Sequence, residues 1–153
     1  MKAKTIALTI SLFFASVAVG FQNNPQIGTW KLNEAKSKFA GKARNHTVVY
    51  EASGDQTKVT VDGVDENGGS VHSEWTGKFD GKDYPVTGDA NSDVRSYRTI
   101  NKNTLAISGK KNGKVTLSGR IVVSRDGKTR TVTTSTTNAQ AKKVVNTAVY
   151  DKQ

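Results

Sequence analysis

The sequence predicts an all-β domain, folded as an antiparallel up-and-down meander barrel of about 8–10 strands. Three observations support this prediction. Residues 21–153 contain 15 Val and 16 Thr but only 3 Leu, a bias toward side chains that suit a pleated sheet. Short segments rich in Gly, Asn and Asp recur at near-regular intervals and are typical of tight turns. No span is long enough to carry a helix between parallel strands, so the strands are expected to be antiparallel.

The first 20 residues are expected to be a secretory signal peptide rather than part of this domain. Met1-Lys2-Ala3-Lys4 gives a basic start, an apolar run extends from Thr5 to Gly20, and Ala18-Val19-Gly20 supplies small residues for cleavage. The alternative, a retained membrane anchor, needs an apolar run of ~20 residues without polar interruptions. We therefore predict cleavage before Phe21, a single domain over residues 21–153 that does not span a membrane, and a secreted or periplasmic location.

Ten segments between the turns have the residue usage of strands. Pro85 makes the fifth segment the weakest, because proline cannot donate a hydrogen bond to a neighbouring strand. Only residues 34–39 are suited to a helical turn. Closure of the meander into a barrel leaves no free edge, whereas a two-sheet β-sandwich is the alternative. The strands are expected over residues 27–33, 44–52, 57–65, 70–79, 84–88, 94–101, 104–110, 115–125, 128–138 and 142–152.

Alternation along each strand assigns one face to the interior. In the second strand, His46 lies at the same alternating positions as the apolar Val48 and Tyr50, so it is expected to face inward with them. In the fourth and eighth strands the inward sets are Val71, Trp75 and Phe79, and Val115, Leu117, Ile121 and Val123.

Two of the predicted strands place polar side chains on the inward face of the barrel. The ninth has Val132 as its only apolar residue, and the sixth turns inward either Val94, Ser96, Arg98 and Ile100 or Arg95, Tyr97 and Thr99. A partly polar interior suits a barrel that holds a ligand, so we predict a non-enzymatic protein that binds a small apolar or amphipathic molecule. The candidate lumen residues are Trp30, His46, Tyr50, Trp75, Arg98, Leu117 and Tyr150.

Positive charge is concentrated in the second half of the chain. Residues 94–153 contain 13 Lys or Arg and 2 acidic residues, against 8 and 11 in residues 21–93. Because consecutive strands of a meander are neighbours, the outward cations of this half are expected to form one basic face. Such a face predicts an alternative function, binding of an anionic envelope lipid or polysaccharide. Its candidate residues are Lys110, Lys111, Lys114, Arg120, Arg125 and Lys128.

The sequence contains no recognisable catalytic pattern. Gly-x-Ser-x-Gly, Walker-type and His-Glu-x-x-His motifs are missing from it, and so is cysteine. His46 and His72, the only histidines, are assigned to opposite faces, so they cannot converge on a zinc ion. We therefore predict no catalytic residues, no metal site and no cofactor, with a hydrolase as the most distant alternative. Export and few exposed aromatic residues argue against nucleic-acid binding, and we expect a monomer.

Each end of the predicted domain has a recognisable sequence pattern. The first strand has Gly28-Thr29-Trp30-Lys31-Leu32 followed by Phe39, and the last strand has Thr147-Ala148-Val149-Tyr150-Asp151-Lys152. They resemble the first and last strands of the lipocalin and fatty-acid-binding (calycin) superfamily. The resemblance implies a lipocalin-like barrel in which a basic residue from the far end covers the first-strand Trp, and only Lys152 is placed for this. The fatty-acid-binding branch also has an Arg two residues before the inward Tyr to hold a carboxylate, where this chain has Ala148.

A second pattern covers more of the chain and includes Asp80-Gly81-Lys82-Asp83-Tyr84-Pro85-Val86-Thr87-Gly88 and Asp126-Gly127-Lys128-Thr129. These segments, together with the end from Asn146 to Gln153, are similar to a group of small secreted bacterial proteins of uncharacterised function. This likeness supports export and supplies no activity.

Overall fold

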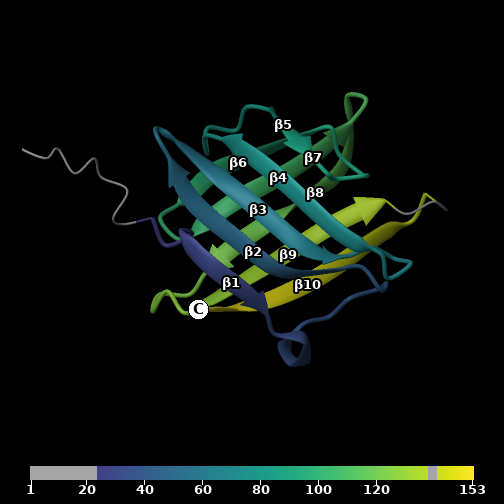
Figure 1. Ribbon diagram of the computed structural model, residues 1–153, viewed down its shortest axis with the longest axis horizontal. Coiled ribbons are helices and arrows are strands. Elements are labelled where there is room, and N and C mark those ends of the chain that lie inside the picture. The colour runs from purple at the N-terminus through teal and green to yellow at the C-terminus, as the bar shows by residue number, and fades with distance from the viewer. Residues whose placement is uncertain (1–23, 138–140) are drawn as a thin grey trace, which may run out of the picture.

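The computed structural model describes residues 24–137 and 141–153, which form ten strands and one short 3-10 helix. Each strand pairs antiparallel with the next along the chain, and β1 also pairs with β10, so the sheet closes into a barrel (Figure 1). The predicted up-and-down barrel is thereby confirmed, and the alternative sandwich is wrong. The elements are β1 (Gly28–Leu32), η1 (Glu34–Lys36), β2 (Arg44–Ser53), β3 (Gln56–Val64), β4 (Ser70–Gly77), β5 (Tyr84–Thr87), β6 (Val94–Asn101), β7 (Thr104–Lys111), β8 (Lys114–Val123), β9 (Thr129–Thr137) and β10 (Lys143–Lys152).

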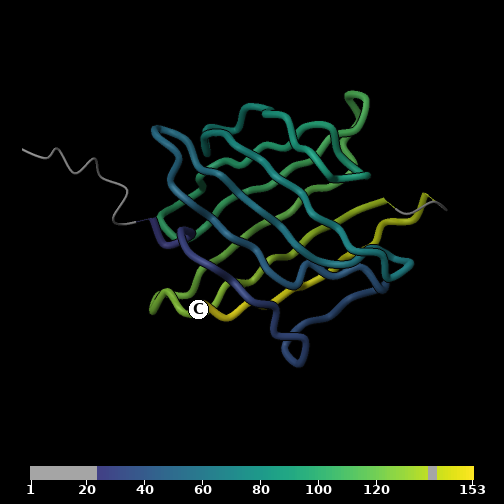
Figure 2. The backbone as a smooth tube through the Cα atoms, in the orientation of Figure 1, coloured from purple at the N-terminus to yellow at the C-terminus, as the bar shows by residue number. Residues whose placement is uncertain are grey.

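The turns between strands gather at two ends of the barrel (Figure 2). The pairing registers place turns 53–56, 101–104 and 123–129 at one end, with the start of β1 and the end of β10. We call this the closed end. Turns 64–70 and 111–114 lie at the opposite end, which we call the open end. The two names refer to how the interior is covered, as described next.

The segment before β1 covers the closed end. Gln26 is buried, and its backbone carbonyl accepts a 2.9 Å hydrogen bond from Trp30 Nε1. Its side-chain Nε2 donates to the carbonyl of Asn103, in the turn between β6 and β7. Because β1 and this turn lie on different sides of the barrel, the segment bridges the end. Lys152 Nζ lies 5.1 Å from the centre of the Trp30 ring, as the calycin resemblance implied.

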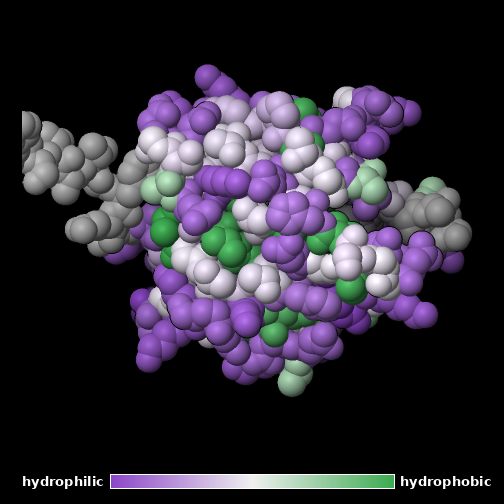
Figure 3. All heavy atoms as spheres, viewed as in Figure 1, coloured by the Kyte–Doolittle hydropathy of each residue, from purple (hydrophilic) through white to green (hydrophobic). Residues whose placement is uncertain are grey.

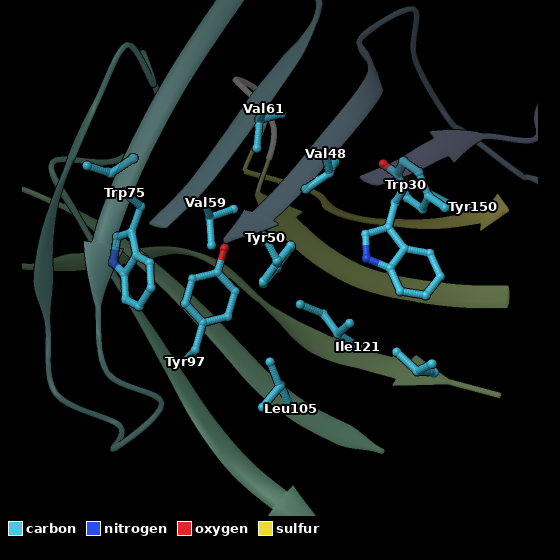
Figure 4. Close-up of a cluster of buried hydrophobic side chains, with 13 residues drawn as sticks. Trp30, Val48, Tyr50, Val59, Val61, Trp75, Tyr97, Leu105, Ile121 and Tyr150 are labelled. Carbon is cyan, nitrogen blue, oxygen red and sulfur yellow. The ribbon is translucent and has the colours of Figure 1, made fainter. Parts of the chain in front are cut away.

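Aromatic side chains fill the interior toward the closed end, where they point toward one another (Figure 4). The Tyr97 ring meets Trp75 edge-on with 4.6 Å between ring centres, and it meets Tyr50 at 6.2 Å. Phe79 stacks on the other side of this group, 6.3 Å from Trp75. Buried aromatic pairs of this geometry contribute beyond the area that they bury, so this cluster is the main stabilising core.

A β-bulge in β2 overturns one inward assignment. The pairing of β2 with β3 shifts between Asn45 and Thr47, so His46 is an extra residue with no partner in the ladder. Its side chain is exposed on the outer surface, and the predicted lumen position of His46 is wrong. Strict alternation fails here because it assumes one residue per step of the ladder.

A second bulge, in β8, has the same effect on Val115. Leu117 pairs with Gly109, but Val115 pairs with the next residue, Lys110, so Thr116 is the extra residue. Val115 is 58% exposed, although alternation predicted that it faces inward. Leu117, beyond the bulge, keeps its predicted inward face together with the buried Ile121.

The sixth strand turns its Arg95 and Tyr97 face inward. Tyr97 is buried, whereas Arg98 is exposed, so the predicted lumen position of Arg98 is wrong. Burial of the large Tyr97 ring against Trp75 decides between the two faces. The backbone of Arg98 instead forms an isolated antiparallel β-bridge with that of Asp80, in the connection between β4 and β5.

The face of the molecule shown in Figure 3 is mostly hydrophilic, with apolar side chains in small separate groups. In the part of the chain that the structure describes, no helix is long and apolar enough to cross a membrane. The predicted signal peptide, residues 1–20, and the predicted cleavage before Phe21 lie outside the described residues.

Candidate functional site

Inward-facing apolar side chains at the open end are less covered than those at the closed end. Tyr50 and Ile121 are 1% exposed and belong to the closed half. Farther toward the open end, two inward apolar residues, Leu117 of β8 and Val144 of β10, are only half-buried. Ile107 and Val132 are half-buried too, but they pair with Tyr97 and Ile121 and pack against the core. The interior is therefore closed at one end and lined by water-accessible apolar groups at the other.

Arg130 of β9 lies inside the barrel between the aromatic side chains. It is 2% exposed, and its Nη2 donates a hydrogen bond to the Tyr50 hydroxyl. The guanidinium carbon lies 4.5 Å from the centre of the Tyr50 ring, 5.7 Å from that of Tyr150 and 5.9 Å from that of Trp30. Arg130 Nε and Nη1 are buried and have no hydrogen-bond partner.

The aromatic neighbours of Arg130 do not neutralise its charge. Burial raises the pKa of Tyr50 well above its usual value, although the Arg130 charge opposes this shift. Burial likewise raises the pKa of Tyr150 to about 12. Both phenols therefore stay protonated at neutral pH. Within residues 24–137 and 141–153, no carboxylate forms an ion pair with Arg130, so it is a buried cation without a counter-charge.

Arg95, the other inward arginine, is in a different situation. Its Nη2 bonds to Oδ2 of Asp89, from the connection between β5 and β6, and both side chains are largely buried. Its carbonyl accepts a 2.9 Å hydrogen bond from Trp75 Nε1. The Asp89 carboxylate therefore compensates the charge of Arg95, whereas Arg130 has no such partner among the residues that the structure describes.

Five of the predicted lumen residues do face the interior. Trp30, Tyr50, Trp75 and Tyr150 are buried in the closed half, and Leu117 lies toward the open end. His46 and Arg98 lie outside, as described above. Sequence reasoning missed Arg130, although a signal was present.

That signal is the position of Arg130 two residues before Val132, the only apolar residue of β9. Alternation through Val132 places Arg130 on the same inward face. The pairing of Arg130 with Tyr150 of β10 agrees with this placement.

The predicted basic face is less concentrated than expected. Lys110 and Lys111 form ion pairs with Asp83 and Asp93, at 2.6 and 3.2 Å. The other four candidates form no ion pair among the residues that the structure describes, and they are spread along the barrel. These four are Lys114 at one turn, Arg120 in the middle of β8, and Arg125 and Lys128 at the opposite turn.

Arg120 borders a hollow of about 480 Å³ on the outer surface of β8, β9 and β10. Its lining is rich in hydroxyl groups, such as those of Thr131 and Thr133, and includes one further cation, Lys143. This hollow combines positive charge with hydrogen-bonding groups.

The two histidines do not lie on opposite faces. Because of the bulge at His46, both His46 and His72 line a surface hollow of about 420 Å³. His72 Nδ1 lies 2.6 Å from Asp62 Oδ1, and this hydrogen bond is the main reason that the pKa of His72 is raised. Over the described residues, no group of three His, Cys, Asp or Glu side chains is placed to hold a metal ion.

Comparisons with known proteins identify the fold only. No protein-family model and no curated protein matches the chain. Among solved structures, it resembles the β-barrel EF1p2_mFAP2b bound to DFHBI, with a TM-score of 0.50 and 11% identity over 84% of this chain and 94% of that one. The redesigned β-barrel mFAP1 bound to DFHBI gives a TM-score of 0.48 and 11% identity over 84% and 95% of the two chains.

Proposed function

We propose that this protein is a non-enzymatic binding protein that holds a small apolar or amphipathic molecule inside the barrel. The observation that carries the proposal is the asymmetry of the interior. The closed end is covered by the segment around Gln26, whereas inward apolar side chains such as Leu117 and Val144 remain half-buried at the open end. Inward apolar groups that water still reaches are the lining that a bound apolar molecule would cover.

The fold is compatible with this function. EF1p2_mFAP2b, which the barrel resembles, is bound to a small molecule. The inward side chains include apolar residues such as Leu117 and Val144 together with polar ones such as Thr134, a mixture that suits an amphipathic ligand. We further propose that the protein acts after export, which the basic start and apolar run of residues 1–20 support.

The binding test uses the neutral fluorophore Nile red and two substitutions on the same strand. Leu117→Trp places a large ring inside the open end, whereas Val115→Trp places the same ring on the outside, two residues away. We expect saturable binding to the wild type, a loss of about tenfold in Leu117→Trp and little change in Val115→Trp. Absence of saturable binding, or equal losses in both variants, would contradict the proposal. Thermal unfolding checks that both variants are folded.

Export is tested separately. N-terminal sequencing of the protein recovered from the periplasm or medium of an expressing bacterium should give a chain that begins near Phe21. An intact Met1 on the exported protein would show that residues 1–20 are not a cleaved signal.

A second candidate function is anion binding at the hollow over β8, β9 and β10. We propose it because Arg120 and Lys143 border this hollow beside several hydroxyl groups. The ligand would be an anionic envelope lipid or polysaccharide, attracted by exposed charges whose field salt screens over ~8 Å.

The measurement is binding to phosphatidylglycerol vesicles at low and high salt. Paired substitution of Arg120 and Lys143 by Glu should abolish a salt-sensitive interaction. The same charge change at Arg125 and Lys128, outside the hollow, is the matched control. Equal effects of the two double variants would remove the hollow as the site.

A further inference from the structure

The hollow over β8, β9 and β10 carries two cations and no acidic group. Arg120 of β8 and Lys143 of β10 are exposed, and neither forms an ion pair within residues 24–137 and 141–153. All the lining residues belong to this described part of the chain, and none of them is Asp or Glu. An anion in the hollow therefore meets two unpaired positive charges without repulsion from a carboxylate at the same place.

Small hydroxyl side chains line the hollow between these two cations. The strand pairing places Thr133 of β9 opposite Arg120, and Ser135 of β9 opposite Ser118 of β8. Thr131 adds a further hydroxyl on the same outward face of β9. Each hydroxyl both donates and accepts hydrogen bonds, so the lining suits a ligand that carries hydroxyl groups as well as negative charge.

The two cations are well separated on the sheet. Lys143 pairs with Thr137, which lies four residues along β9 from Thr133, the partner of Arg120. With ~3.3 Å per residue along a strand and ~4.8 Å between strands, the Cα atoms of the two cations are about 16 Å apart. A chain with several anionic groups meets both cations at these positions, whereas a single phosphate group lies beside one of them.

The apolar side chains of the hollow do not favour a lipid surface. Val122 is 40% exposed and Val145 is 55% exposed, but they project from different strands. Val122 pairs with Thr131 and Val145 with Ser135, so the outward Thr133 lies between their levels on β9. Two divided valines offer little apolar area for insertion into a bilayer. The lining favours instead a ligand that is rich in hydroxyl groups.

We propose that this hollow binds an acidic polysaccharide, a chain of sugar units with carboxylate groups at intervals. Its carboxylates bind Arg120 and Lys143, and its hydroxyl groups form hydrogen bonds with the Thr and Ser side chains of β9. This inference rests on the second candidate function, anion binding at the hollow, and decides between the two classes of ligand named there. It is independent of any ligand in the barrel interior.

The test compares hexagalacturonate with maltohexaose, a neutral chain with the same number of sugar units, by isothermal titration calorimetry at low salt. The wild type should bind hexagalacturonate and show no saturable binding of maltohexaose, because the exposed charges supply the attraction. Substitution of both Arg120 and Lys143 by Gln should weaken hexagalacturonate binding about tenfold or more. Galacturonate monomer, which cannot reach both cations, should bind about tenfold or more weakly than the hexamer.

Two matched variants separate the charge from the hydroxyl contacts. Substitution of Arg125 and Lys128 by Gln makes the same change of charge outside the hollow, and it should leave hexagalacturonate binding within about twofold of the wild type. Thr133→Val keeps the charge and removes one hydroxyl, so it should weaken hexagalacturonate binding about threefold. The same variant should bind phosphatidylglycerol vesicles as the wild type does. Thermal unfolding checks that every variant is folded.

The outcomes distinguish this inference from the anion-binding function on which it rests. Equal affinity of the wild type for hexagalacturonate and maltohexaose, or equal losses in the two double variants, would overturn the polysaccharide inference. Vesicle binding that depends on Arg120 and Lys143, without binding of hexagalacturonate, would also overturn it and would leave anion binding at the hollow intact. Failure of the wild type to bind either hexagalacturonate or the vesicles would overturn both.

Discussion

The two ends of the barrel interior share one sheet but differ in how their side chains are used. At the closed end, Trp75 and Tyr97 pack ring against ring, and Gln26 covers Trp30 from outside the barrel. At the open end, Leu117 and Val144 face inward and remain half-buried. The difference separates two tasks in one small domain. The closed end supplies stability, and the open end supplies an accessible apolar lining.

The position of the charges sharpens this comparison. Arg95 is paired with Asp89, whereas Arg130, beside the aromatic cluster, has no carboxylate partner within residues 24–137 and 141–153. A polar group that is buried without a partner lowers stability in the absence of a ligand. The buried charge of Arg130 is thus a feature that stability alone does not explain.

The largest expected effect distinguishes the two ends by stability. Trp75→Ala should lower the free energy of unfolding by about 3–5 kcal/mol, since the substitution leaves a large cavity in a packed cluster. Leu117→Ala should cost about 1 kcal/mol, because this side chain buries less surface. Urea unfolding followed by circular dichroism measures both values. A cost of ~2–5 kcal/mol for Leu117→Ala would mean that the open end is packed as tightly as the closed end.

The second prediction compares the two inward arginines in ligand-free protein. Arg95→Met should cost about 2 kcal/mol, because it leaves the largely buried Asp89 carboxylate unpaired. Arg130→Met should change stability by less than about 1 kcal/mol or raise it, since the removed charge has no carboxylate partner among the described residues. Urea unfolding of both variants, with Arg98→Met as the surface control, decides the comparison. Equal losses at the two positions would mean that Arg130 is compensated within the protein.

The third prediction concerns alkaline pH and the closed end. The pKa of Tyr150 rises from 10.0 to about 12 on burial, so the folded state keeps a proton that the unfolded state loses between these values. Stability should therefore fall as pH rises above 10, by about 2 kcal/mol for this group at pH 12. Tyr150→Phe should show a shallower fall in urea unfolding. If water reached the closed end, the variant and the wild type would have the same pH dependence.

The smallest expected effect is on the outer surface, at the start of β4. The hydrogen bond that His72 Nδ1 donates to Asp62 raises the pKa of His72, and Glu74 adds to the shift. The contribution to stability is present below pH 6.5 and is lost as pH rises through the raised value. Asp62→Asn should lower the pKa of His72, as measured by NMR titration, with little change in stability because the pair is exposed. An unchanged pKa would show that the pair is not formed in solution.

The local pattern of the chain predicts most of the barrel. Val and Thr usage, the Gly and Asn turns and the alternation in β4 place Trp75 inside and give strand bounds close to the observed ones. These features are local, because turn conformation and the two faces of a strand depend on neighbouring residues. The same alternation, applied through Val132, also puts Arg130 on the inward face, but the sequence prediction did not include Arg130.

Only the tertiary structure decided which side chains meet and which stay without a partner. The bulges that expose His46 and Val115 depend on how one strand pairs with the next, and a single strand carries no record of that register. The burial of Tyr97 rather than Arg98 depends on the Trp75 ring across the barrel. The lack of a carboxylate beside Arg130 among the described residues likewise depends on all the strands around it. The free energy of a buried charge is set by groups that are adjacent in space but distant in the sequence.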